Sequence, residues 1–235
     1  MKKVLITGGS RGIGEELVRE FSLKGYKVYF IYKSSEEKAN LISKETGAVA
    51  VKCDVSKSDD VLNTKKIINE DIDIIINNAG ISQIKMFQDI TEDDWNNMFD
   101  TNIKGIFNVT KAFIDGMIKN KYGRIINISS MWGETGASCE VHYSASKAAV
   151  IGFTKALAKE LGPSGITVNC VSPGLIKTEM NSNISEDDIK EIENETPVGR
   201  IGNIKEIAEA VLYFSSDNAG FTTGTVLSVN GGLVI

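Results

Sequence analysis

The stretch Thr7-Gly8-Gly9-Ser10-Arg11-Gly12-Ile13-Gly14 joins an apolar run to an amphipathic segment, and it decides the fold. Residues 3–7 predict a strand, and Ile13, Leu17, Val18 and Phe21 fall on one stripe of a following helix. Glycines at such a junction are typical of the dinucleotide loop in a doubly wound sheet. Gly8 permits the tight turn, Gly12 lets the backbone approach a pyrophosphate, and Gly14 lets the helix pack on the strand. The free N–H groups and dipole of the helix N-terminus favour phosphates.

Short apolar runs alternate with helical patterns along the rest of the chain, which indicates βαβ units on a parallel sheet. Gly25 is placed to end the first helix, and Thr91-Glu92-Asp93-Asp94 predicts a capping box that opens a later one. We expect a single-domain α/β Rossmann fold over residues 1–235, a doubly wound parallel sheet of about seven strands flanked by helices. The strands are expected at 3–7, 27–32, 48–52, 72–77, 123–128, 165–171 and 225–229.

Composition excludes several classes of function. The net charge of −5 and the lack of a dense Lys/Arg run argue against nucleic acid as a partner. No stretch approaches the roughly 18 unbroken apolar residues of a membrane helix. Cys53, Cys139 and Cys170 lack metal-ligand spacing, which predicts reduced thiols in a cytoplasmic protein without a bound metal. His142 is the single histidine, so a Ser-His-Asp hydrolase or a multi-histidine metal site is disfavoured.

The second strand bears on the choice of cofactor. An acid that binds a ribose 2′-hydroxyl should end this strand, yet residues 28–34 carry no carboxylate. Lys33 stands there instead, and Arg11 projects from the glycine loop. Two cations suit a 2′-phosphate, which favours NADPH/NADP+ over NADH. A solvated strand end is the alternative interpretation of Lys33.

A second chemical signal is Tyr143-Ser144-Ala145-Ser146-Lys147. Residues four apart share a helix face, so the Lys147 charge is expected to lower the pKa of Tyr143 and suit it to proton transfer. Such a pair is also common on ordinary helices. Ser130, thirteen residues upstream of Tyr143, follows the apolar run 124–128 and supports the chemical interpretation. Residues 178–202 are polar and long for a plain connection, which favours a substrate loop.

Taken together, these motifs resemble the short-chain dehydrogenase/reductase family over residues 3–232. The matching motifs are Thr7-Gly8-x-x-x-Gly12-x-Gly14, Asn77-Asn78-Ala79-Gly80, Ser130 with Tyr143-x-x-x-Lys147, and Pro173-Gly174. The resemblance implies an oxidoreductase that transfers hydride between a nicotinamide and a ketone, with Tyr143 as the acid. It implies that Ser130 binds the substrate carbonyl, that Lys147 holds the nicotinamide ribose, and that Asn102 holds a relay water. Ser129 is the rival to Ser130, although the thirteen-residue offset to Tyr143 matches Ser130 in this family, and an asparagine that only satisfies local backbone groups is the alternative for Asn102.

The cofactor site implied by the same resemblance is extensive. Asp54 and Val55 would meet the adenine end, and Asn78, Ala79 and Gly80 would support the cofactor. Pro173, Gly174 and Ile176 would wall the nicotinamide, with Thr178 near its carboxamide or the phosphates. The full expected set is Gly8, Ser10, Arg11, Gly12, Ile13, Gly14, Tyr32, Lys33, Asp54, Val55, Asn78, Ala79, Gly80, Tyr143, Lys147, Pro173, Gly174, Ile176 and Thr178.

Two subgroups of the family offer different substrates. The chain is similar to bacterial 3-oxoacyl-acyl-carrier-protein reductases of fatty acid biosynthesis, which implies an acyl-carrier-protein partner. It departs from them at Ile81-Ser82-Gln83-Ile84-Lys85 and at Ser164, which leaves Lys121 and Arg124 as the expected carrier contacts. The run 132–141 looks more like reductases of the 5-aminopentanone group on a lysine of elongation factor P. There Glu140 would attract a cationic amine, although a surface glutamate is the alternative.

Two further expectations concern assembly and class. Members of the family are often tetramers, so a homotetramer is expected, with contacts from Phe107, Val109, Phe113 and Met117 and from the tail 233–235. Core burial would account for most of these residues equally well.

A redox sensor that binds NAD(P) without turnover is a different class of function on this fold. The complete set of catalytic motifs disfavours it.

Overall fold

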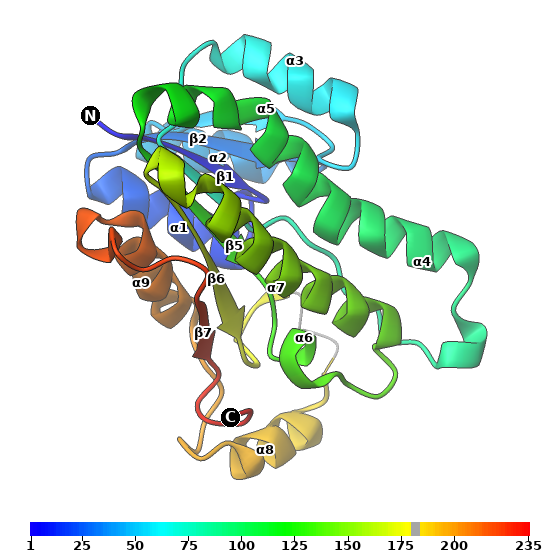
Figure 1. The fold of residues 1–235 in the computed structure, drawn as a ribbon. Coiled ribbons are helices and arrows are strands. Elements are labelled where there is room, and N and C mark those ends of the chain that lie inside the picture. Colours follow the sequence, from blue (N-terminus) through cyan, green and yellow to red (C-terminus); the bar gives the residue numbers. More distant parts are fainter. Residues whose placement is uncertain (180–183) are drawn as a thin grey trace.

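A computed structural model describes residues 1–179 and 184–235, and the described residues contain one sheet of seven parallel strands (Figure 1). The strand order is β3-β2-β1-β4-β5-β6-β7, so the direction of winding reverses between β1 and β4. The predicted doubly wound parallel sheet is therefore confirmed, with strand bounds that differ from the expected ones by at most two residues at either end. The strands are β1 (Lys3–Thr7), β2 (Lys27–Tyr32), β3 (Val49–Lys52), β4 (Ile74–Asn77), β5 (Gly123–Ile128), β6 (Ile166–Pro173) and β7 (Val226–Val229).

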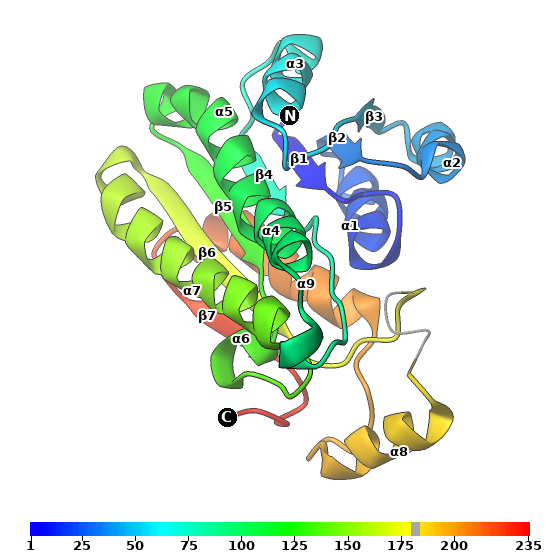
Figure 2. The same ribbon diagram turned by 90° about the vertical axis from the view of Figure 1, so that its right-hand side faces the viewer.

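Helices connect successive strands and cover both faces of the sheet, as Figure 2 shows. One apolar cluster joins α1, α2 and α9 to one face, and a second joins α3, α5 and α7 to the other. Ile31 and Ile75 belong to the second cluster while Phe30 and Ile76 belong to the first, because successive strand side chains point to opposite faces. The helices are α1 (Gly12–Leu23), α2 (Glu36–Thr46), α3 (Ser58–Ile68), α4 (Glu92–Phe99), α5 (Gly105–Asn120), α6 (Trp132–Thr135), α7 (Val141–Leu161), α8 (Glu186–Glu195) and α9 (Ile204–Ser215).

The turn from β1 into α1 depends on Gly14. A Cβ atom added at Gly14 would lie 2.0 Å from the carbonyl oxygen of Gly8, so this position admits no larger residue without backbone movement. The turn is also tied to β4, because the Thr7 hydroxyl accepts hydrogen bonds from the backbone N–H groups of Asn78 and Ala79 at 3.0 and 2.9 Å. The glycine loop and the segment after β4 therefore form one rigid edge above the sheet.

The long helical region between β4 and β5 is interrupted. Thr91 and Asp94 form the predicted capping box at the start of α4. A π-helical turn over Asp100–Lys104 then separates α4 from α5 and carries the buried Asn102. Turns of this kind are wider than an α-helical turn and occur frequently at functional sites. No sequence motif marks this interruption, and only the pattern of backbone hydrogen bonds reveals it.

The segment 178–202 contains helix α8, which lies at the same end of the molecule as the C-terminus (Figure 1). Residues 180–183 of the expected substrate loop lie outside the described part of the chain. A bridge between Ile176 and Gly202 brings the two ends of the segment together. Across the described ranges, no helix combines the length and the apolar character that crossing a bilayer requires.

Three of the residues expected at a subunit interface belong to the core of the chain itself. Val109, Phe113 and Met117 are buried in the cluster beneath α5, whereas Phe107 is 47% exposed.

The expectation of a carrier contact at Arg124 is wrong. This side chain is 5% exposed, stacks on the Tyr122 ring and donates to the Ser216 carbonyl. Lys121 is exposed.

Candidate active site

Two adjoining cavities open at the carboxyl ends of the strands, where a doubly wound sheet binds its ligands. One has a volume of about 350 Å³ and the other about 730 Å³. Both are lined by Ile13, Asn78, Gly80, Ile81 and Thr178, so they form one continuous cleft. We call the first the nucleotide pocket and the second the substrate pocket. With the exception of Asn102, every residue expected from the sequence to bind cofactor or catalyse lines one of them.

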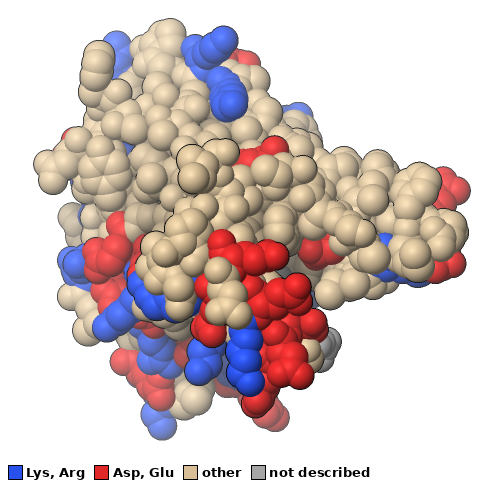
Figure 3. All heavy atoms as spheres, turned by 90° about the horizontal axis from the view of Figure 1, so that it is seen from below, with Lys and Arg blue, Asp and Glu red and all other residues tan. Residues whose placement is uncertain are grey.

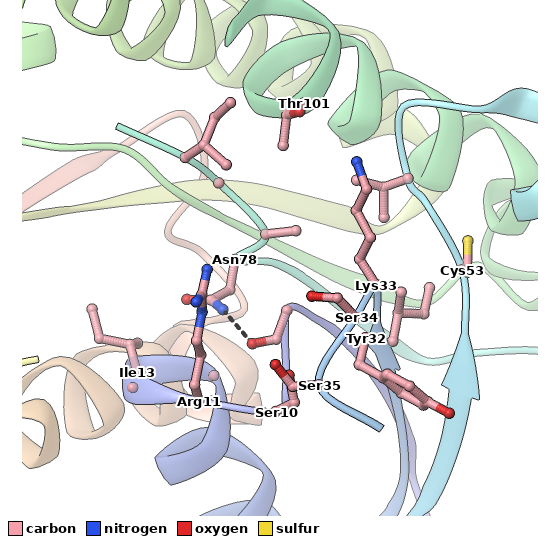
Figure 4. Close-up of a pocket in the computed structure, with 18 of the residues that line it drawn as sticks. Ser10, Arg11, Ile13, Tyr32, Lys33, Ser34, Ser35, Cys53, Asn78 and Thr101 are labelled. Atoms are coloured by element: carbon pink, nitrogen blue, oxygen red, sulfur yellow. Dashed lines mark hydrogen bonds between the residues drawn. The ribbon is translucent and has the colours of Figure 1, made fainter. Parts of the chain in front are cut away.

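The nucleotide pocket is built on the glycine loop and the end of β2. Figure 4 shows Arg11 and Lys33 on either side of it, with Ser10, Ser34 and Ser35 between them. The Lys33 ammonium lies 2.8 Å from the Asp54 carboxylate. Burial would raise the pKa of Asp54, but the bonds from Lys33 and Ser56 outweigh it and hold that pKa below its usual value. Lys33 is therefore not the free cation that the sequence suggested.

A second ion pair crosses the mouth of this pocket. Glu179 lines the nucleotide pocket and pairs with Lys38 of α2. Thr178 lies over the glycine loop, because a Cβ atom added at Gly12 would be 3.7 Å from its methyl group. The segment after β6 therefore lies against the glycine loop.

The substrate pocket brings Ser130, Tyr143 and Lys147 together. Lys147, at the buried side of α7, donates to the Ile128 carbonyl at 2.9 Å, and its Nζ lies 5.7 Å from the centre of the Tyr143 ring. Ser130 and Tyr143 line the same pocket, and Ser130 lies near enough to lower the pKa of Tyr143 in opposition to burial. The neighbouring Ser129 instead donates to the Lys147 carbonyl at 2.8 Å. Of the two serines, the geometry thus favours Ser130 as the partner of Tyr143.

Burial, rather than the neighbouring amine, dominates the electrostatics of the pair. It raises the pKa of Tyr143 to about 12, although the bond with Ser130 acts in the opposite direction. It lowers the pKa of Lys147 to about 8. The sequence predicted a lowered tyrosine pKa, and in the structure this expectation is wrong. Burial disfavours the charged form of each group, and neither group is among the causes of the other's pKa shift.

Asn102 lies behind the pocket wall. Its side chain accepts from the Ile81 N–H and donates to the Ile81 carbonyl, both at 2.9 Å, and it donates to the Ser146 hydroxyl at 3.0 Å. A Cβ atom added at Gly80 would lie 3.3 Å from Asn102 Oδ1 and 3.4 Å from Lys147 Nζ. Gly80 therefore separates Asn102 from Lys147, and the close approach of the two elements depends on it.

Some lining residues were missed by the sequence analysis. They follow the named motifs or lie on segments without a motif, and only the three-dimensional placement identifies them. On the nucleotide side they are Ile31, Ser34, Ser35, Cys53, Ile81 and Thr101, and on the substrate side Ser82, Gln83, Ile84, Met131 and Leu175. Glu179, Ile184, Asp188 and Ile192 also line the cleft and belong to the expected substrate loop 178–202. Within residues 1–179 and 184–235, no three His, Cys, Asp or Glu side chains gather into a possible metal site.

The substrate pocket has an acidic wall. Glu140 and Asp188 line it, and Glu140 has no ion-pair partner among the described residues. Burial raises the pKa of Glu140. Helix α8, which supplies Asp188, has the sequence EDDIKEIENE. Figure 3 shows acidic side chains gathered on this end of the molecule, with Lys and Arg interleaved.

Comparison with known proteins agrees with this architecture. Residues 8–234 match the model of a family described as enoyl-(acyl carrier protein) reductase. The chain is 44% identical to an acetoacetyl-CoA reductase of Shinella zoogloeoides, over 97% of this chain and 96% of that one. It is 40% identical to a 3-oxoacyl-[acyl-carrier-protein] reductase of Haemophilus influenzae, over 100% and 98%. A crystal structure of the corresponding Brucella melitensis reductase superposes with a TM-score of 0.95 at 34% identity, covering 100% of this chain and 91% of that one.

Proposed function

Because the chain belongs to the short-chain dehydrogenase/reductase family, whose members bind a nicotinamide cofactor, we propose that it reduces a ketone to a secondary alcohol with NADPH. The observation that carries the proposal is the placement of Ser130, Tyr143 and Lys147 on one wall of the substrate pocket, which adjoins the nucleotide pocket. A ketone in the larger pocket can thereby meet these side chains and a nicotinamide at the same time.

The fit of a dinucleotide rests on the cradle at the end of β1. At Gly14 a Cβ would collide with the backbone, and the N–H groups that begin α1 face an open pocket. When bound, the reduced nicotinamide supplies a hydride to the carbonyl carbon. The chain supplies the rest: Ser130 and Tyr143 donate hydrogen bonds to the carbonyl oxygen as it gains negative charge, and Tyr143 Oη transfers its proton to that oxygen.

The state of Tyr143 suits the reductive direction. A pKa of about 12 keeps its hydroxyl protonated at neutral pH, so the group is ready to donate. The Lys147 ammonium, one helical turn away, stabilises the phenolate that remains after the transfer. Asn102 holds the Ile81 segment beside Lys147, which fits the proposed relay role for this residue.

Selection of NADPH is assigned to Arg11 and Lys33. Both line the nucleotide pocket, together with the hydroxyls of Ser34 and Ser35. A 2′-phosphate at the end of β2 would compete with Asp54 for Lys33, so Arg11, which forms no ion pair within the described part of the chain, is the better placed cation. The opposite preference, for NADH, is an outcome that the experiment below detects.

The first candidate substrate is a β-ketoacyl thioester carried on acyl carrier protein. It is supported by the similarity to acetoacetyl-CoA and 3-oxoacyl reductases over nearly the whole chain. The 730 Å³ substrate pocket has room for a small ligand of this kind. The exposed Lys121 is then the candidate contact for an acidic carrier.

The second candidate is the 5-aminopentanone group on a lysine of elongation factor P. The specific observation in its favour is the acidic wall: Glu140 and Asp188 line the pocket and α8 is rich in carboxylates. Carboxylates on the wall of the pocket attract a cationic amine and repel the phosphates of a thioester carrier. The two candidates therefore predict opposite responses to the charge of residue 140.

The deciding experiment compares initial rates on both substrates, acetoacetyl thioester and ketone-modified elongation factor P, with NADPH and with NADH. The Tyr143→Phe variant serves as the chemical control, since it should keep its fold and cofactor binding while turnover falls by roughly 10²- to 10⁴-fold. Near wild-type reduction by this variant would refute the assignment of the acid. Nicotinamide binding without turnover of any ketone would indicate a sensor instead.

We also infer a homotetramer from the family, with Phe107 of α5 and the tail up to Ile235 as the exposed apolar contacts. Sedimentation velocity of the wild type and of Phe107→Glu tests this. A monomeric wild type would contradict it.

A further inference from the structure

His142 is buried in the first turn of α7, next to Tyr143, yet it does not line the substrate pocket. Its Nε2 atom lies 2.9 Å from Oε1 of Gln83, which does line that pocket. The reaction described above uses neither side chain. A buried histidine bonded to a pocket residue raises the question of what the bond holds in place.

The orientation of the Gln83 amide follows from its other partner. Gln83 Nε2 lies 3.0 Å from Oδ1 of Asp94. The bond from Lys85 to Asp94 is the largest of several that lower the pKa of Asp94, so this carboxylate is ionised and can only accept. The NH₂ group of Gln83 must therefore face Asp94 and its carbonyl must face His142. It follows that His142 donates through Nε2–H, and that Nδ1 is the unprotonated nitrogen of the neutral ring.

The same network fixes the loop that carries Gln83. Lys85 bonds to Asp94 at 2.6 Å through its ammonium, and its backbone N–H donates to the Cys139 carbonyl at 2.7 Å. The loop after β4 is thus attached to the start of α4 and to the segment that leads into α7. Lys85 makes both attachments, two residues after Gln83, so long-range contacts set the position of the Gln83 amide in the pocket wall.

We propose that Gln83 is a specificity-determining residue that binds an amide group in the arm of the ketone substrate, and that His142 is a positioning residue that holds the Gln83 amide for this purpose. After its bonds to His142 and Asp94, the Gln83 side chain keeps one N–H and one oxygen lone pair. This pair of groups complements the C=O and N–H of an amide. The inference rests on the proposed ketone reduction and deepens it by naming a feature of the substrate.

The test uses two small ketones that differ in one respect. Acetoacetyl-N-acetylcysteamine carries an amide in its arm, and S-ethyl acetothioacetate does not. Gln83→Leu should raise KM for the first ketone about tenfold relative to the second, which corresponds to the loss of one hydrogen bond, with little change in the ratio of kcat values. Gln88→Leu, on an exposed turn outside both pockets, is the matched control and should leave the ratio of KM values unchanged.

The role of His142 is tested by substitution and rescue. His142→Leu should reproduce the KM effect of Gln83→Leu, the double variant should add nothing to it, and His142→Gln, which keeps an N–H donor, should restore much of the discrimination. If the role of His142 were merely structural, His142→Leu would lower the stability of the protein and would lower kcat equally for both ketones. His142→Gln would then restore no discrimination between them. Where His142→Leu fails to fold, Gln83→Leu alone decides the proposal.

A second readout needs no turnover. Because His142 is the single histidine, nitrogen NMR of histidine-labelled protein reports one ring. We expect the Nε2–H tautomer in the wild type and a shifted Nε2–H signal in Gln83→Leu. The amide-bearing ketone should shift this signal in the wild type and should not shift it in Gln83→Leu. A wild type that reduces neither ketone would overturn the proposed function only, and the NMR response would still decide this inference. Equal KM ratios in wild type and Gln83→Leu would overturn the inference while leaving ketone reduction intact.

Discussion

Lys33 and Asp54 form an ion pair of 2.8 Å across the mouth of the nucleotide pocket, and the lysine is 64% exposed while the aspartate is 14% exposed. The pair joins the end of β2 to the segment after β3, where the adenosine end of a dinucleotide is expected. A ligand phosphate at this place would have to share Lys33 with a carboxylate that is already bonded to it. Arg11 has no such competitor in an ion pair among the described residues.

We therefore predict that Arg11 contributes more than Lys33 to the selection of NADPH. Arg11→Ala should weaken NADPH binding about tenfold or more and leave NADH binding nearly unchanged, because one charge-assisted contact is lost. Lys33→Ala should have a smaller effect. Fluorescence titration of both reduced nucleotides measures this, with Lys44→Ala on the outer part of α2 as control. Equal losses for NADPH and NADH would contradict the assignment.

Lys147 is predicted to destabilise the folded state, although it takes part in the proposed reaction. Its pKa is about 8 when folded, against an ordinary value of 10.5, so below pH 8 the folded protein bears a buried charge. Lys147→Met should raise the free energy of unfolding at pH 7 by about 1–3 kcal/mol and abolish turnover.

The difference in the free energy of unfolding between the wild type and Lys147→Met changes with pH in a definite direction. Between pH 8 and 10.5 the unfolded chain binds more protons at residue 147 than the folded chain, so the stability of the wild type rises relative to Lys147→Met. Urea unfolding of both proteins across this range measures the difference, in which the titration of Tyr143 and Cys170 cancels to first order. A difference that does not shrink as the pH rises would contradict the burial of the charge.

Gly14 and Gly152 are predicted to respond in opposite directions to the same substitution. Gly14→Ala should destabilise the fold by about 3 kcal/mol or more, because the new Cβ would meet the Gly8 carbonyl oxygen. Gly152 lies in α7 with nothing within 4 Å of the added atom, so Gly152→Ala should stabilise by about 0.5–1 kcal/mol. Urea unfolding compares the two, and a stable Gly14→Ala protein would show that the loop relaxes more easily than its contacts indicate.

Glu140→Gln distinguishes the two candidate substrates. Removing this charge should lower the rate on the aminopentanone substrate about tenfold relative to the acyl thioester, since the amine loses a charged partner. The measurement is the ratio of kcat/KM for the two substrates. Glu160→Gln, an exposed change on the same helix, is the control. Equal effects on both substrates would mean that the acidic wall does not select between them.

Much of the fold follows from local sequence patterns. The glycine loop, Gly25 after α1 and the capping box at Thr91 act over a few neighbouring residues, and the structure confirms all three. The strand runs are equally local, because a buried parallel strand is largely apolar along its length. Most motif residues that line the cleft follow the end of a strand, whereas Tyr143 and Lys147 were recognised by their four-residue spacing on a helix.

The features that the sequence missed depend on contacts between distant segments. The raised pKa of Tyr143 depends on burial from every side, which four-residue spacing cannot reveal. Arg124 is buried because Tyr122 and Ser216 enclose it, although its residue type suggests a surface contact. The bond between Gln83 and His142 spans 59 residues and belongs to no motif.

The carboxylate of Asp94 accepts bonds from the Thr91 backbone and hydroxyl as well as from Gln83 and Lys85. One side chain thus completes a helix terminus and braces a wall of the substrate pocket. A designer who transplants residues 81–85 from another reductase to alter substrate choice would need to transplant the beginning of α4 with them. Otherwise the new loop would lack the bonds that Gln83 and Lys85 make to Asp94, and Asp94 at the start of α4 would lose these two partners.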